Sequence, residues 1–195
     1  MAANDRNLMQ NRFAVALDEH QRLFARLSEC LDDVDHAARR LQDTLLNGGK
    51  ILLCGNGGSA ADAQHAATEL VVRYRRSRRA LAAIALTTDT SILTASGNDY
   101  GFETLFARQV EALGRPGDSL IAISTSGQSP NICRAAQTAR DLGVSVIGLT
   151  GEGGGVLAPI CDIAVCVPST ETARVQEAHI FVLHVWCDAV ERYFG

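Results

Sequence analysis

The first quarter of the chain has the spacing of amphipathic helices. Between about residues 5 and 48, apolar side chains recur at three- and four-residue steps, as at Leu23, Leu27 and Leu31. No proline interrupts this stretch, and Asn47-Gly48-Gly49 provides a stop. We expect two helices here, with a break near Cys30 to Asp33, and we expect residues 1–48 to pack on the rest of the molecule or on a partner subunit.

After residue 49, short apolar runs alternate with helical stretches. The runs are five or six residues long and rich in Ile, Val and Leu, which is typical of strands buried on both faces. The expected strands are Lys50–Cys54, Leu81–Leu86, Ser119–Ser124, Val144–Leu149 and Asp162–Val167. The expected helices are Ser59–Tyr74, Phe102–Leu113, Ser129–Leu142 and Thr172–Phe194. This alternation predicts an α/β fold with a five-stranded parallel sheet covered on both sides, in one domain spanning residues 1–195.

Composition and charge narrow the class of protein. The 195 residues are 47% hydrophobic and 21% charged, which is typical of a globular chain. The net charge of -4 argues against general nucleic-acid binding. No apolar segment is long enough to cross a bilayer, and the N-terminus lacks the pattern of a signal peptide. The six cysteines form no CxxC pair, so we expect free thiols in the cytoplasm.

Two loops directly after predicted strands have the composition of phosphate-binding loops. They are Cys54-Gly-Asn-Gly-Gly-Ser59 and Ser124-Thr-Ser-Gly-Gln-Ser129, and each opens a predicted helix. Glycines let the backbone approach an anion, and the N–H groups of a helix N-terminus attract it. Each loop alone could simply turn the chain and cap a helix. Two of them at equivalent positions of one sheet favour phosphate binding.

The first loop also partly matches the dinucleotide-binding fingerprint in Gly55-x-Gly57-x-x-Ala60. That interpretation requires an acidic residue at the end of the second strand. The chain has Leu86-Thr87-Thr88 there, and Asp89 is better placed to cap a helix. We therefore do not expect a nicotinamide cofactor.

Four polar residues on two distant helices form a second candidate site. His65 and Glu69 are four residues apart and share a helix face, whereas Gln176 and His184 lie eight apart on the last helix. These groups could bind a divalent metal, or Glu and His could transfer protons as base and acid. On the spacing alone, a solvated His65–Glu69 pair and a structural His184 are favoured, because this spacing is common by chance.

Other polar features are ambiguous. Asn98-Asp99, between Gly97 and Gly101, is typical of a turn. The basic run Arg73–Arg79 is expected to be a solvated loop, although its arginines could also reach an anionic substrate or a neighbouring subunit. Asp62 could orient a ligand, and we expect His179 to be structural.

The chain resembles the SIS-domain sedoheptulose 7-phosphate isomerases, also called phosphoheptose isomerases, from about residue 10 to the C-terminus. The motifs that carry the resemblance are, in order, Gly55-Asn-Gly-Gly-Ser-Ala-Ala-Asp-Ala-Gln-His65, Glu69, Gly97-Asn-Asp-Tyr-Gly101, Ser124-Thr-Ser-Gly-Gln-Ser129, Gln176 and His184. No single motif is specific, but the ensemble is.

The resemblance implies a flavodoxin-like, doubly wound sheet in a homotetramer, with active sites built between subunits. It implies one zinc per subunit, bound by His65, Glu69, Gln176 and His184. The implied substrate contacts are Asn56, Gly57, Gly58, Glu69, Asn98, Asp99, Ser124, Thr125, Ser126, Ser129 and Gln176.

The implied reaction converts sedoheptulose 7-phosphate to D-glycero-D-manno-heptose 7-phosphate through an enediol, with Glu69 as base and His184 as acid. It is the first step towards nucleotide-activated heptose for lipopolysaccharide or other surface glycans.

Two other functions fit parts of the pattern. A replication initiator-associating protein with the same fold is a tetrameric, non-catalytic binding module that shares much of the first loop. It lacks the full set of acid, base and metal groups, whereas Glu69 and His184 are both present here. An isomerase or sensor of another phosphosugar would have a similar phosphate loop.

Overall fold

A computed structural model describes residues 2–195, with side chains described from residue 9 onwards. At its centre is a five-stranded, all-parallel sheet in the order β2-β1-β3-β4-β5. The strands are β1 Ile51–Cys54, β2 Ala83–Ala85, β3 Ser119–Ser124, β4 Ser145–Thr150 and β5 Ile163–Cys166. This is the doubly wound order of flavodoxin-like folds, and the strand order reverses between β1 and β3. The fold class predicted from the sequence is confirmed.

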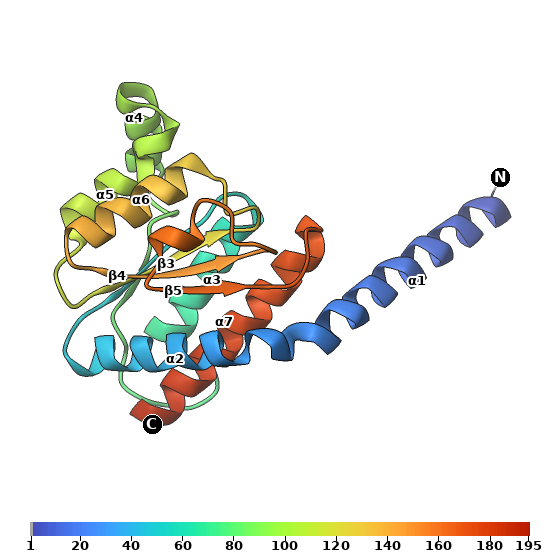
Figure 1. Cartoon of the computed structure of the whole chain (residues 1–195), viewed down its shortest axis with the longest axis horizontal. Coiled ribbons are helices and arrows are strands. Elements are labelled where there is room, and N and C mark those ends of the chain that lie inside the picture. The colour runs from blue at the N-terminus through green and yellow to red at the C-terminus, as the bar shows by residue number, and fades with distance from the viewer. Residues whose placement is uncertain (1) are drawn as a thin grey trace.

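Helices cover both faces of the sheet (Figure 1). One face packs against α2 Leu31–Leu46, α3 Gly58–Val71 and α7 Thr172–Phe194. The other packs against α5 Leu105–Leu113 and α6 Pro130–Asp141. The strands β1 and β3 are buried along their whole length, which explains why their sequences are continuously apolar.

The N-terminal segment forms two helices, as expected. The helix α1 spans Ala2–Arg26 and extends away from the body of the molecule (Figure 1). A short 3₁₀ turn, η1 Leu27–Cys30, separates it from α2. The break therefore lies slightly earlier than the expected Cys30 to Asp33. Along α2, one face is buried through Ala37, Leu41 and Leu45.

The sequence prediction was wrong about one element. Residues Thr90–Tyr100 form a helix, α4, which is preceded by its N-cap Asp89 and followed by η2 Phe102–Thr104. The Asp89 side chain accepts a hydrogen bond from the Ile92 N–H, so Asp89 does cap a helix. Asn98 and Asp99 therefore lie in the last turn of α4 and not in a loop. The remaining short element is η3 Ala158–Ile160.

Two further expectations concern membrane-spanning segments and the cysteines. Within residues 2–195, no helix has both the length and the apolar character that crossing a membrane requires. All six cysteines are free thiols, as expected.

Candidate active site

The first candidate loop, Cys54–Ser59, connects β1 to α3 and depends on a glycine for its backbone conformation. Gly57 has φ +55°, a conformation that favours glycine, and α3 begins directly after it. Gly58 lies against the last helix, because a Cβ built on it would come within 2.6 Å of Nε2 of Gln176. The first loop and Gln176 are thus in direct contact, although 118 positions separate them along the chain.

The second loop, Ser124–Ser129, joins β3 to α6 and presents several hydroxyl groups. The hydroxyls of Ser124 and Ser129 are 2.9 Å apart, and Ser126 Oγ accepts a hydrogen bond from the Gln128 N–H. Ser129 precedes α6, whose first residue is Pro130. The loop thus ends at a helix N-terminus with hydroxyl donors beside it, which is an arrangement suited to a phosphate.

A pair of amides joins the two loops at the strand-order reversal. Asn56 Nδ2 donates to Asn131 Oδ1 across 2.9 Å, and Asn131 Nδ2 donates to Asn56 Oδ1 across 2.8 Å. Asn131 is buried at the start of α6. We expected the Asn56 side chain to contact substrate. In the structure, both polar atoms of its amide bind Asn131, which follows the second loop. Asn131 was missed from the sequence, where nothing marks it as a partner of Asn56.

Two histidines from distant helices meet on one side of the sheet. Nε2 of His65 on α3 lies 3.0 Å from Nε2 of His184 on α7. The same His65 atom lies 3.3 Å from Oε1 of Glu69. The contact between α3 and α7 brings these groups together. Three of the four residues proposed from the sequence thus converge, and the fourth, Gln176, lies against Gly58 at the start of α3.

The surroundings of His184 favour its neutral form. Burial lowers the pKa of His184, and the neighbouring His65 and Arg75 lower it further, while Glu69 opposes them. The neutral ring has one nitrogen with a lone pair and one N–H, so it can accept or donate a proton. Glu69 is about one-fifth exposed, which leaves its carboxylate reachable from outside.

Asp62 is also part of this helix face. Its Oδ2 is buried without a hydrogen-bond partner among the described residues. Burial raises the pKa of Asp62, although the nearby His65 opposes that effect. A carboxyl group in this environment favours its protonated form more than usual.

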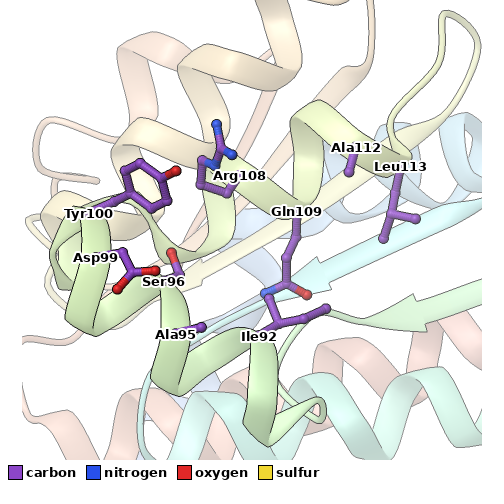
Figure 2. A pocket seen from close by; sticks show the side chains of 9 residues that line it. All are labelled: Ile92, Ala95, Ser96, Asp99, Tyr100, Arg108, Gln109, Ala112 and Leu113. Carbon is purple, nitrogen blue, oxygen red and sulfur yellow. The ribbon is translucent and has the colours of Figure 1, made fainter.

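Asn98 and Asp99 lie elsewhere in the subunit. They project from α4, which packs on η2 and α5, and Asn98 Nδ2 donates to Asp99 Oδ1 across 2.7 Å. Asp99 lines a pocket between α4 and α5 (Figure 2). The pocket has a volume of about 350 Å³, and in it the Arg108 guanidinium carbon lies 4.7 Å from the centroid of the Tyr100 ring. Among the described side chains, no hydrogen bond or ion pair joins Asn98 or Asp99 to the His65–His184 pair.

The basic run is only partly solvated. Its backbone leaves α3 after Val71 and forms a loop, as expected, but the Arg78 side chain is 1% exposed. Arg78 Nη2 donates to the backbone carbonyl of Glu69 across 2.7 Å. The expectation of a freely solvated loop is therefore wrong for Arg78, which is part of the support of α3.

Comparison with known proteins decides the family. A profile of the SIS domain family matches residues 17–151. The chain is 53% identical to the phosphoheptose isomerase of Campylobacter concisus over 178 residues, which cover 91% of this chain and 94% of that one. The chain belongs to the phosphoheptose isomerase family. It is accordingly an isomerase, and the non-catalytic binding module is not favoured.

Other phosphoheptose isomerases agree with this assignment. The protein of Roseiflexus sp. is 61% identical over 155 residues, which cover 80% of this chain and 79% of that one. The solved structure of phosphoheptose isomerase from Neisseria gonorrhoeae is 46% identical, with a TM-score of 0.90, and covers 94% of this chain and 99% of that one.

Proposed function

We propose that this chain interconverts sedoheptulose 7-phosphate and D-glycero-D-manno-heptose 7-phosphate in the cytoplasm, as the first step towards nucleotide-activated heptose. The observation that carries the proposal is the meeting of His184, His65 and Glu69, at 3.0 and 3.3 Å. An aldose–ketose shift needs a base and an acid on one sugar, together with a site that holds its phosphate.

The chemistry assigns separate atoms to separate tasks. Glu69 removes the proton from the carbon next to the carbonyl while His184 donates a proton to the carbonyl oxygen, which gives the enediol. Glu69 then returns its proton to the former carbonyl carbon, and His184 takes up the proton of the neighbouring hydroxyl. Oε1 of Glu69 and Nε2 of His184 both face His65. Oε2 of Glu69 and Nδ1 of His184 are therefore the atoms left to act on the sugar. The hydroxyls of Ser124–Ser129 and the loop after β1 hold the phosphate, so that binding there positions the reacting carbons.

We further propose that each subunit binds one zinc through His65, Glu69, Gln176 and His184. Two ligands of a tetrahedral zinc, each about 2.1 Å from the metal, lie about 3.4 Å apart. The separations of His65 Nε2 from Glu69 Oε1 and His184 Nε2, 3.3 and 3.0 Å, are close to that value. Among the described residues, however, no group of three or more His, Cys, Asp or Glu side chains has the geometry to hold a metal ion as the side chains stand. The fourth proposed ligand, Gln176, is outside those residue types.

Bound zinc would supply a Lewis acid for the oxyanion of the enediol. The ligands would have to be deprotonated, and the lowered pKa of His184 fits that requirement. Removing the metal with a chelator and measuring zinc content beside the melting temperature tests this part. Stoichiometric zinc whose loss lowers the melting temperature supports it, and zinc-free protein with full activity contradicts it.

A homotetramer with active sites between subunits completes the proposal. The helix α1 exposes Met9, Phe13 and Leu17, which follow one another at four-residue steps and form an apolar stripe. An apolar groove of about 320 Å³, lined in part by Phe24, Leu31 and Phe181, lies where this helix joins the body. Exposed apolar surface of this kind is typical of a subunit interface. A neighbouring subunit would also be the source of Asn98 and Asp99 for each site.

The direct test is conversion of sedoheptulose 7-phosphate, followed by NMR of the sugar. We expect Glu69→Gln and His184→Ala to lower kcat about 10²- to 10⁴-fold. Each variant also removes a proposed zinc ligand, so we expect a lower melting temperature as well, and kcat is compared per folded chain. A metal-loaded oligomer without turnover would contradict the proposal. A thermal-shift panel of heptose, pentose and amino-sugar phosphates then identifies the substrate, because the true ligand raises the apparent stability most.

A further inference from the structure

The basic loop after α3 is held by a single buried carboxylate. Glu191, near the end of α7, accepts hydrogen bonds from the backbone N–H groups of Tyr74, Arg75 and Arg76 at 2.9, 2.7 and 2.8 Å. The Glu191 side chain is 1% exposed, so these bonds are shielded from water. Three successive N–H groups on one carboxylate fix the path of the chain through this segment.

Arg78 completes this arrangement from the other end of the loop. Its Nε lies 3.8 Å from Oε1 of Glu191, and its Nη2 donates to the Glu69 carbonyl. Burial on its own would raise the pKa of Glu191. The N–H donors of Arg76, Arg75 and Tyr74 and the charge of Arg78 outweigh that effect and lower it. The carboxylate therefore stays ionised and keeps its hydrogen bonds.

The fixed backbone places the ring of Tyr74 on the candidate catalytic histidine. The rings of Tyr74 and His184 are stacked, with centroids 5.5 Å apart and an angle of 28° between their planes. His65 touches the same imidazole edge-on, with centroids 5.0 Å apart. The guanidinium of Arg75 lies 4.8 Å from the Tyr74 centroid and contributes to the lowered pKa of His184.

We propose that Tyr74 is a positioning residue for the His184 imidazole, and that Glu191 positions Tyr74 through the backbone of the loop. The broad, roughly two-fold torsion of a histidine ring leaves its plane poorly fixed by the helix alone. A stacked aromatic ring restricts that torsion and keeps Nε2 directed at His65. Neither Tyr74 nor Glu191 needs to touch the sugar in this role.

The role rests on the proposed function, since it concerns the acid of that reaction. It predicts a loss in the chemical step and not in substrate binding. Misplacement of a catalytic group by about 1 Å can cost about 10²-fold in rate. We therefore expect Tyr74→Leu and Glu191→Gln each to lower kcat about 10- to 100-fold, with KM within about threefold. In Glu191→Gln, an NH₂ group replaces one of the two carboxylate oxygens and cannot accept hydrogen bonds from the backbone N–H groups of residues 74–76. The loop after α3 would therefore lose part of its attachment to α7.

The matched controls are Tyr74→Phe and Tyr193→Leu. Tyr74→Phe keeps the stacking surface and should retain kcat within about twofold, which a role of the hydroxyl group would not allow. Tyr193 is an exposed aromatic residue on the same helix as His184, and its replacement by Leu should leave kcat unchanged. In the double variant Tyr74→Leu/Glu191→Gln, the losses should be no larger than in either single variant, because both act through one contact.

A readout independent of turnover is NMR of the His184 ring in metal-free protein labelled with ¹⁵N-histidine. We expect Tyr74→Leu and Glu191→Gln to shift the His184 ring resonances, and Tyr74→Phe to preserve them. Unchanged resonances and unchanged kcat in Tyr74→Leu overturn the proposal. If the unaltered chain does not turn over sedoheptulose 7-phosphate while the resonances shift as expected, the proposed reaction fails and the positioning role stands.

Discussion

His179 donates from Nε2 to the carbonyl oxygen of Thr150 across 3.0 Å, and its Nδ1 is buried without a partner among the described residues. The contact attaches α7 to the end of β4. The adjacent Gly151 N–H donates to the carbonyl of Thr125, which lies in the second loop, Ser124–Ser129. His179 is fully buried and faces the sheet. The sequence-based expectation that it is structural fits this placement.

The burial of His179 predicts a pH dependence of stability. Burial lowers its pKa to about 4, whereas an unfolded chain has the ordinary value of about 6.5. The unfolded chain therefore takes up a proton first as the pH falls. The contribution is fully present above about pH 6.5 and is lost progressively down to about pH 4, where the loss is on the order of 3 kcal/mol.

Urea unfolding of the original chain and of His179→Gln between pH 8 and 4 measures this effect. Gln can still donate to Thr150 but does not titrate, so its stability should fall less between pH 6.5 and 4. Other titrating groups cancel in the difference between the two curves. Curves that stay parallel over the whole range would show that the folded chain protonates this imidazole as readily as the unfolded chain does.

The amide bridge between Asn56 and Asn131 predicts a coupled loss of stability and of phosphate binding. Asn131→Ala removes two hydrogen bonds and leaves the Asn56 amide unpaired, at a cost of about 1–3 kcal/mol. The freed first loop should also raise KM for the sugar phosphate several-fold. Gln137→Ala, an exposed amide on the same helix, is the control for both measurements. An unchanged KM would show that the Asn56–Asn131 contact does not contribute to phosphate binding.

The contact of Gly58 with Gln176 predicts a loss of activity without a loss of folding. A Cβ at position 58 would come within 2.6 Å of the amide nitrogen of Gln176, which is the mobile end of a long side chain. The amide can move away at little cost, and Ala is favoured over Gly in a helix by about 0.5–1 kcal/mol. In metal-free protein, Gly58→Ala should thus keep its melting temperature, and in the complete enzyme it should lower kcat at least tenfold, about 1.4 kcal/mol. An unchanged kcat would show that Gln176 does not contribute to the active site.

A buried ion pair at the amino ends of β1 and β3 predicts a loss of stability without a loss of activity. Asp118 is 4% exposed and accepts from Lys50 Nζ at 2.5 Å, from the Lys50 N–H at 2.9 Å and from the Arg115 N–H at 2.8 Å. Asp118→Ala leaves these donors without an acceptor and should lower the free energy of unfolding by about 3 kcal/mol. Chemical denaturation measures the change, and kcat per folded subunit should stay the same because the site lies at the other ends of the strands. A fall in kcat at full folding would contradict this separation.

The sequence predicted the fold well where burial is uniform. The ranges Ser119–Ser124 and Thr172–Phe194 agree with the structure at both ends. In contrast, Thr90–Tyr100 was missed because Ser96 is its only buried residue, so no apolar stripe marks the helix. The glycine within it, Gly97, made a turn the natural interpretation.

The sequence predicted the residues of the candidate site but not the distances between them. The spacing of His65 and Glu69 places them on one face of α3, but no local pattern gives the distance from His65 to His184 on α7. That distance follows from the packing of small side chains on α3, such as Ala63, Ala66 and Ala67, in the same core as α7. The stacking of Tyr74 on His184 was missed for the same reason, since a tertiary contact through Glu191 sets it.

The dependence of the site on α7 has a consequence for synthesis of the chain. His65 emerges early from the ribosome, but His184, Gln176 and Glu191 are translated near the end. A nascent polypeptide released before residue 184 has the hydroxyl loop and both His65 and Glu69, yet it lacks the acid proposed for the proton transfer at the sugar oxygen. On the proposed chemistry, catalysis therefore begins only once the last helix has docked on the completed sheet.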